Sequence, residues 1–221
     1  MMKTSGAASG MQVAPHGGSV HKWHERLTPM SKPIDLFKEI WHQAKREGTL
    51  KHRNAVCVST VDADGYPNAR FVDLKEAEDT GFVFCTHLGS GKAHDIARNP
   101  KAAITLWWEH VARQIRIKGL CEPLLPQEAD AHWASRLRDA QIATVTFSQS
   151  CALDSLESLE GTYARAVAGF GEADIPRPDD WGGFRLRPEY IEFLEFKENR
   201  LHRRTAHAMV DGQWHQRFLQ P

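Results

Sequence analysis

Three polar side chains near the C-terminus have the residue types and spacing of an anion-binding site. Arg200, His202 and Arg204 alternate along the run 199–204. If this run is a strand, its period of two puts the three side chains on one face. Two guanidiniums would then flank an imidazole, so the face could bind a phosphate bidentately around a titratable group. Taken alone, these residues are more typical of an edge strand that carries charges for solubility.

A second set of polar residues recurs where predicted strands end. Arg70 and Lys75 put a cation at each end of one strand, and Thr86 closes the next strand. The run Ser90-Gly91-Lys92 puts a hydroxyl, a flexible residue and a cation at a helix start, where backbone N–H groups favour an anion. Gln114 lies within a strand, where a buried amide needs a partner. Each of these residues alone is usually a helix cap or a solvated side chain.

Composition excludes several classes of protein. The 221 residues include 28 Lys and Arg and 28 Asp and Glu, which argues against a nucleic-acid binder held by bulk electrostatics. No apolar run is long enough to span a bilayer, so we expect no membrane partner. The four cysteines form no CxxC pair, which predicts a reduced, cytoplasmic protein with buried thiols. The twelve histidines show no metal-ligand spacing, and we expect no metal site.

The chain divides into a tail and one domain. Residues 1–31 are polar and lack the apolar segment of a secretory signal, so we expect a disordered N-terminal tail. The tail could instead act as a lid, or Met30 could be an alternative start. Residues 32–221 have the length of a single domain.

The elements that must position the polar residues are mostly short strands. Apolar spacing predicts helices over 33–46, 90–99, 126–138 and 153–167. Strands are predicted over 55–61, 69–75, 81–86, 102–109, 114–120, 183–187, 190–196, 200–209 and 213–218. This pattern indicates a small antiparallel barrel with helices packed outside it. The chain has no GxGxxG or Walker loop, which disfavours a Rossmann or P-loop nucleotide site.

Together these residues resemble the pyridoxine/pyridoxamine 5′-phosphate oxidase family of FMN-dependent split-barrel enzymes, from about residue 33 to the end. The matching segments keep the family's order and spacing: 70–75, 84–86, 90–94, 113–114, 136–142, 148–150, 181–184, 191–193, 200–204 and 217–221. The resemblance implies a mainly β fold with peripheral helices, in which an antiparallel, Greek-key split barrel binds FMN. It also implies a homodimer with the cofactor at the interface.

The resemblance further implies a role for each matching residue. Arg200 and His202 would be catalytic and would face a pyridine substrate near the flavin. The cofactor-binding set would be Arg70, Phe71, Val72, Lys75, Cys85, Thr86, Lys92, Gln114, Gln149, Ser150, Leu194 and Arg204, with Arg70 and Lys92 on the FMN phosphate. The substrate-binding set would be Lys75, His132, Arg136, Ala140, Arg200 and His202, with Lys75 and Arg136 on the substrate phosphate.

Four residues depart from the family's pattern. Gly91 stands where the family often has a second phosphate-binding arginine, and Leu194 stands where a tryptophan normally packs by the flavin. His132 and Ala140 stand where a tyrosine and a serine contact the substrate phosphate. Each lost charged hydrogen bond would weaken binding by about 1.5–3 kcal/mol. Phe196, on the same predicted strand face as Leu194, could partly fill the aromatic role.

The implied reaction is oxidation of pyridoxamine or pyridoxine 5′-phosphate to pyridoxal 5′-phosphate, with hydride transfer to flavin and release of hydrogen peroxide. One alternative is an FMN-dependent oxidase of secondary metabolism that acts on a reduced, phenazine-type ring, which the run 84–87 and the Leu-Gln-Pro terminus favour. A second alternative is a non-catalytic flavin-binding module, which Leu194 and Gly91 favour. Lys75 and Arg136 favour a phosphorylated substrate over the phenazine-type ring, and peroxide release on adding substrate would separate both enzymes from the flavin-binding module.

Overall fold

The computed structural model of the protein describes residues 28–29, 32–48, 52 and 54–221. The predicted disorder of residues 1–31 therefore lies almost entirely outside the described residues. The exception is β1 (Thr28–Pro29), which pairs with the strand nearest the C-terminus.

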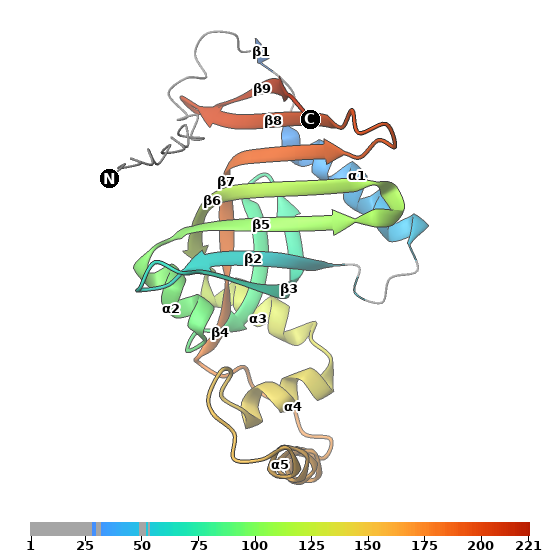
Figure 1. Ribbon diagram of the computed structural model, residues 1–221. Helices are drawn as coiled ribbons and strands as arrows, with labels where there is room; N and C mark the ends of the chain where they lie inside the picture. The colour runs from blue at the N-terminus through green and yellow to red at the C-terminus, as the bar shows by residue number, and fades with distance from the viewer. Residues whose placement is uncertain (1–27, 30–31, 49–51, 53) are drawn as a thin grey trace, which may run out of the picture.

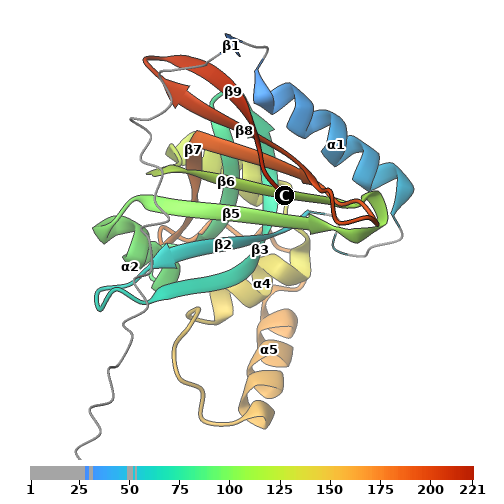
Figure 2. The ribbon, with the colours of Figure 1, turned by 45° about the horizontal axis from the view of Figure 1, so that its top comes forward.

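An antiparallel sheet of nine strands forms the body of the protein (Figure 1). Its strands are β2 (Ala55–Val61), β3 (Pro67–Glu78), β4 (Gly81–His87), β5 (Lys101–Trp108), β6 (Arg113–Pro123), β7 (Trp181–Glu195), β8 (Arg203–Val210) and β9 (Gln213–Leu219), together with β1. The order is β1-β9-β8-β7-β4-β3-β2-β5-β6, and a further pairing of β6 with β7 closes the six strands from β7 to β6 into a barrel. β8 and β9 extend the sheet beyond the barrel (Figure 2). The predicted mainly β barrel is confirmed.

Five α-helices lie around the barrel in the described part of the chain. They are α1 (Pro33–Glu47), α2 (Gly91–Arg98), α3 (Pro126–Ala134), α4 (Arg138–Thr146) and α5 (Leu156–Phe170), and a 3-10 turn, Glu109–Val111, follows β5. α4 packs against α5 at the end of the molecule away from β8 and β9 (Figure 1). None of the described helices is long and apolar enough to cross a membrane.

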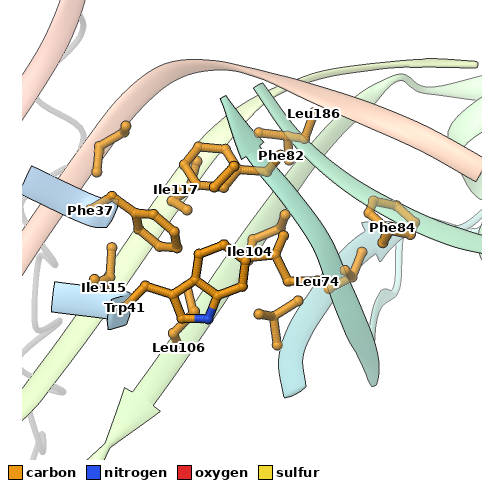
Figure 3. Close-up of a cluster of buried hydrophobic side chains, with 14 of the residues drawn as sticks. Phe37, Trp41, Leu74, Phe82, Phe84, Ile104, Leu106, Ile115, Ile117 and Leu186 are labelled. Atoms are coloured by element: carbon orange, nitrogen blue, oxygen red, sulfur yellow. The ribbon is translucent and has the colours of Figure 1, made fainter. Parts of the chain in front are cut away.

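The core fills the barrel interior, and α1 closes it (Figure 3). α1 begins at Pro33, whose fixed φ suits a first helical turn, and its apolar residues recur at helical spacing. Phe37 of α1 is fully buried and meets Phe82 of β4 edge to face, with 4.9 Å between the ring centres. Burying a side chain of this size stabilises the fold by about 1.5–3 kcal/mol.

The structure corrects three predicted elements. The predicted strands 183–187 and 190–196 form one strand, β7, because a bulge opposite Lys118 and Gly119 accommodates Pro188 without ending the pairing. The predicted helix 126–138 ends at Ala134, and a separate helix, α4, follows. The predicted strand 200–209 begins only at Arg203.

The cysteines differ in part from the predicted buried thiols. All four are free, and Cys121 is buried, whereas Cys57 and Cys85 are half-buried and Cys151 is exposed. Among the described residues, no group of three or more His, Cys, Asp or Glu side chains could hold a metal ion.

The bulge between β6 and β7 generates a stability prediction. A Cβ on Gly119 would lie 1.9 Å from the Arg187 carbonyl oxygen, which is fixed backbone. We expect Gly119→Ala to lower the free energy of unfolding by about 1–3 kcal/mol, measured by urea denaturation. The control is Gly169→Ala in α5, where a Cβ meets nothing within 4 Å and helix propensity favours Ala. A Gly119→Ala midpoint equal to that of the control would contradict the prediction.

Candidate active site

A polar cavity of about 470 Å³ lies where β3, β4 and the start of α2 meet. Most of the predicted cofactor-binding residues line it: Arg70, Phe71, Val72, Lys75, Cys85, Thr86, Lys92, Gln149 and Ser150. Arg136, Asp73 and Gly91 complete the lining. The structure therefore brings together side chains that are up to 80 residues apart in the chain, from Arg70 to Ser150. We call this cavity the phosphate-side cavity.

Lys92 is a buried cation at the centre of this cavity, with 7% of its surface exposed. Its Nζ donates to neutral oxygens, at 2.8 Å to Thr86 Oγ1 and at 3.2 Å to both Ser90 Oγ and Gln149 Oε1. No ion pair among the described residues includes it. Burial, and secondly the charge of Arg70, lower the pKa of Lys92. An anion in the cavity would therefore neutralise a charge that the protein leaves uncompensated.

Arg70 lies beside Lys92 and carries the second positive charge. Its Nη1 donates to Thr60 Oγ1 at 2.6 Å and to the Asn68 carbonyl at 3.1 Å, while its Nη2 lies 3.6 Å from Asp95 Oδ2. Asp95 also accepts a hydrogen bond from Thr60 at 2.6 Å. This end of the cavity holds two cations against one carboxylate, so its net charge favours an anion.

The same cavity also holds Lys75 and Arg136. Lys75 Nζ lies 3.2 Å from Asp73 Oδ2. Arg136 lies in the turn between α3 and α4, where its Nη2 donates to Thr144 Oγ1 at 3.1 Å and its guanidinium lies 5.5 Å from the Trp181 ring centre. Its Nε is buried and has no hydrogen-bond partner among the described residues, and burial lowers the pKa of the guanidinium. A ligand oxygen here would satisfy this donor.

Cys85 lines both the phosphate-side cavity and a smaller neighbouring cavity of about 310 Å³. Burial raises the pKa of its thiol to about 11. The thiol is therefore protonated at neutral pH and is neither a nucleophile nor an anion in this cavity.

The other predicted site residues lie in a second region, formed by β6, β7 and β8. Gln114, Leu194 and Arg204 are cross-strand neighbours in register, so they share one face of the sheet. Arg204 donates from Nε and Nη2 to Glu192 Oε1, at 2.9 and 2.8 Å, and Glu192 is only 2% exposed. Arg204 Nη1 donates to the Gln220 carbonyl at 3.1 Å. These bonds fix the guanidinium plane.

Arg200 and His202 lie in the loop between β7 and β8, and the prediction that they alternate along a strand with Arg204 is wrong. Arg200 has a φ of +65°, a left-handed conformation that ends any extended pairing. The loop is held by hydrogen bonds from Arg200 N to the Lys197 carbonyl, 3.1 Å, and from His202 N to the Arg200 carbonyl, 2.8 Å. Arg200 is exposed, whereas His202 lines a cavity of about 900 Å³ together with Arg204. We call this second cavity the loop-side cavity.

The two cavities share no lining residue. One chain therefore carries the predicted site as two separate parts. The structure does not bring His132 or Ala140 to the lining of the phosphate-side cavity or of its smaller neighbour. His132 Nε2 instead lies 3.3 Å from Glu76 Oε1.

Sequence reasoning missed the residues that support the site from behind. Asp95 and Thr60 hold Arg70, Glu192 holds Arg204, and Trp181 lies beside Arg136. Asp95 follows Lys92 by three residues on α2, which puts both on one helix face, and this spacing was an available signal. The contact of Glu192 with Arg204 depends on the pairing of β7 with β8, which no local pattern indicates.

The buried Lys92 generates a prediction about stability and anion binding. We expect Lys92→Met to raise the urea midpoint of the ligand-free protein, because a desolvated charge is removed, and to abolish the stabilisation that added phosphate gives. The control is Lys101→Met on exposed β5 surface, which should change neither quantity. Loss of stability in Lys92→Met with phosphate protection retained would contradict the prediction.

The same charge gives a pH dependence with a defined sign. The pKa of Lys92 is lower in the folded protein than its usual value of 10.5, so between the two values the unfolded chain binds more protons. The stability of the ligand-free protein should therefore gain a contribution from Lys92 as pH rises towards 10.5, while phosphate protection falls. Lys92→Met should lack both trends.

Comparison with known proteins adds an independent line of information. Residues 42–168 match the family model described as pyridoxamine 5′-phosphate oxidase, and residues 181–221 match the model described as pyridoxine 5′-phosphate oxidase C-terminal dimerisation region. The pyridoxine/pyridoxamine 5′-phosphate oxidase of Shewanella frigidimarina is 39% identical over 189 residues, which cover 86% of this chain and 89% of that protein.

Two solved structures are similar. PhzG from Burkholderia lata, in complex with tetrahydrophenazine-1-carboxylic acid, has a TM-score of 0.82 and 30% identity, over 87% of this chain and 94% of that one. A pyridoxamine 5′-phosphate oxidase-related, FMN-binding protein from Nostoc punctiforme has a TM-score of 0.71 at 19% identity, over 87% of this chain and all of that one. The second similarity concerns the fold alone.

Proposed function

The chain belongs to the pyridoxine/pyridoxamine 5′-phosphate oxidase family, and we propose that it is an FMN-dependent oxidase that converts pyridoxamine or pyridoxine 5′-phosphate to pyridoxal 5′-phosphate. The observation that carries the proposal is the buried Lys92 beside Arg70, a cationic pair without a sufficient counter-charge in a cavity of ligand size. Because proteins of this family bind FMN, the anion that we propose for this cavity is the FMN phosphate.

The residues present fit FMN and a phosphorylated substrate. Arg70 and Lys92 would bind the cofactor phosphate, with the backbone N–H groups at the start of α2. Lys75 and Arg136 would bind the substrate phosphate, and the Arg136 Nε, which has no partner among the described residues, supports this role. Bound FMN would supply the redox chemistry, in which a hydride is accepted from the substrate carbon and oxygen is reduced to hydrogen peroxide.

A homodimer would complete each site. The segment that matches the C-terminal dimerisation model includes Leu194, Arg200, His202 and Arg204. None of these residues lines the phosphate-side cavity of its own chain. We infer that a two-fold interface brings the loop of one subunit to the phosphate-side cavity of the other. Gln114, Leu194 and Arg204 would then line the flavin, and Arg200 and His202 would orient the substrate. Their work is binding and orientation, together with the exclusion of water around the reacting carbon.

The support for His132 and Ala140 as substrate ligands is weaker. Ala140 has no polar side-chain atom, and the His132 imidazole lies beside Glu76. Lys75 and Arg136 would therefore carry the substrate phosphate with fewer hydrogen bonds than the family pattern provides, and we expect a higher KM for that reason.

A second candidate substrate is a reduced aromatic acid. The similarity to PhzG in complex with tetrahydrophenazine-1-carboxylic acid favours it, since a carboxylate could also bind Arg136 bidentately.

Purified holoenzyme should form pyridoxal 5′-phosphate under air from the phosphorylated vitamers but not from the unphosphorylated ones. Turnover of a reduced phenazine-type acid alone would replace the first proposal with the second.

Subunit complementation tests the proposed site directly. Arg136→Ala and His202→Ala should each lose most of the activity, because each variant damages both sites of its own dimer. After unfolding and refolding as an equimolar mixture, half of the dimers should be mixed, and each mixed dimer has one intact site. About a quarter of the wild-type activity should therefore return. Sites contained within one subunit would give no recovery.

Gly91 generates a prediction about cofactor affinity. A Cβ added at this position meets nothing within 4 Å, so the backbone leaves room for Gly91→Arg to restore a cation at the cavity. We expect the Kd for FMN to fall about 10-fold or more, in a flavin fluorescence titration, with the Kd for riboflavin unchanged. Gly89→Arg, which also enters open space two residues earlier, is the control for added net charge. Equal tightening of riboflavin would show that no phosphate is contacted.

A further inference from the structure

Three rings from two segments form a continuous series of edge-to-face contacts beside the loop-side cavity, which we call the stack. Trp107 at the end of β5 meets Phe196 edge to face, with 4.6 Å between ring centres and an interplanar angle of 86°. Phe196 in turn meets His202, with 5.0 Å between ring centres at 62°. The Phe196 amide also donates to the Ala112 carbonyl at 3.0 Å, which ties the β7–β8 loop to the β5–β6 turn. In Figures 1 and 2 the β5–β6 and β7–β8 connections lie on the same side of the molecule, at the ends of their strands.

The same loop fixes the proton of the His202 ring. The backbone N–H of Lys197 donates to His202 Nδ1 at 3.1 Å. A nitrogen that accepts a hydrogen bond cannot carry the proton of a neutral imidazole, so that proton is on Nε2. Within the described part of the chain, no hydrogen bond uses Nε2, and the imidazole lines the loop-side cavity.

We propose that Phe196 and Trp107 are positioning residues for His202, and that His202 acts on the substrate as a hydrogen-bond donor through Nε2–H rather than as a base. This inference rests on the proposed function, because it deepens the role of His202 in that site. The stack limits rotation of the imidazole about its side-chain bonds, and the Lys197 amide selects the tautomer. Together they present one N–H in one direction.

The donor assignment limits what His202 can do. While Nδ1 accepts a hydrogen bond, the neutral imidazole carries its proton on Nε2, so Nε2 can donate to an acceptor atom of a ligand but cannot remove a proton from it.

The stack compensates for a local weakness. Arg200 in the same loop has a left-handed φ, which is a strained conformation for a residue with a side chain, and Arg200 and Leu201 are exposed. A loop of this kind would sample several conformations unless side chains anchored it. Phe196 is the first residue of the loop, and its contact with Trp107 anchors the loop there. Trp107 is half exposed and lies in register with Gln114. Aromatic pairs of this geometry contribute beyond the area that they bury.

The first test measures the tautomer in the FMN-loaded protein labelled with 15N-histidine. The His202 signals are identified by their absence in His202→Gln. We expect a proton on Nε2 and an unprotonated Nδ1 in wild type and in Phe196→Tyr, and averaged signals of both tautomers in Phe196→Ala. This readout needs no substrate. A proton on Nδ1 in the wild-type protein would overturn the donor assignment.

The second test is a double-mutant cycle on kcat. Phe196→Ala should lower kcat about tenfold, and Phe196→Tyr should restore it to within roughly twofold of wild type. In the His202→Ala background, Phe196→Ala should have almost no further effect, because a positioning residue acts through the group that it holds. Equal losses in both backgrounds would overturn the positioning role.

Matched variants separate positioning from folding. Trp107→Leu should reproduce the Phe196→Ala effect in weaker form, and Trp107→Phe should rescue it. Tyr66→Ala, an exposed aromatic residue at the β2–β3 turn, should leave kcat unchanged. FMN affinity and dimer mass should match wild type in every stack variant. Loss of either in both Phe196→Ala and Trp107→Leu would assign the stack to folding and overturn the proposal.

The two tests also separate failure of this inference from failure of the proposed function. If the wild-type protein oxidises neither phosphorylated vitamer, the proposed function fails, and the tautomer measurement alone decides whether the stack holds the ring. If the vitamers are oxidised but His202 exchanges between tautomers, the function stands and this inference fails.

Discussion

The pairing of β7 with three other strands is the constraint on which the rest of the structure depends. Its first residues pair with β4, nearly its whole length pairs with β6, and its last residues pair with β8. The pairing with β6 closes the barrel, and the pairing with β8 carries the sheet outward. Trp181 at one end lies beside Arg136, while the loop that begins at Phe196 holds His202. A strand of this length spans on the order of 45 Å when straight, so one chain keeps the two parts of the site apart.

Electrostatics divides the two parts in a different way. The phosphate-side cavity keeps its cations poorly compensated, since Lys92 bonds only neutral oxygens and Arg136 leaves one donor unpaired. The loop-side region does the opposite, because the buried Glu192 accepts from Arg204 and also contacts Arg116 and Tyr190. One region is therefore prepared for an anion that arrives from solution. In the other region, Glu192 already neutralises the charge of Arg204, so this region can be buried against another protein surface without leaving an unpaired charge.

Sequence reasoning predicted the features that depend on local patterns. The strand Ala55–Val61 has the predicted limits, and the polar residues at the ends of β3 and β4 do meet at one cavity. Sequence reasoning failed where the local structure depends on contacts with residues that are far away in the chain. Alternation at 200–204 looked like a strand, but Arg200 turns the chain into a loop. Residues 183–187 and 190–196 were predicted as two strands, but a bulge in β7 opposite Lys118 and Gly119 keeps the strand continuous. The contact of His132 with Glu76 lies between segments that no spacing rule connects.

The raised pKa of the Cys85 thiol affects how resistant the protein is to oxidation during turnover. An oxidase that releases hydrogen peroxide exposes its own cavity lining to that oxidant first, and cysteine is attacked as the thiolate. With a pKa of about 11, roughly one Cys85 thiol in 10,000 is deprotonated at neutral pH. Burial therefore slows the first step towards sulfenic acid at the place where peroxide is most concentrated. The charges of Lys75 and Arg136 favour the thiolate, but desolvation of the thiol outweighs them, so the only sulfur that lines the cavity among the described residues is protected from oxidation.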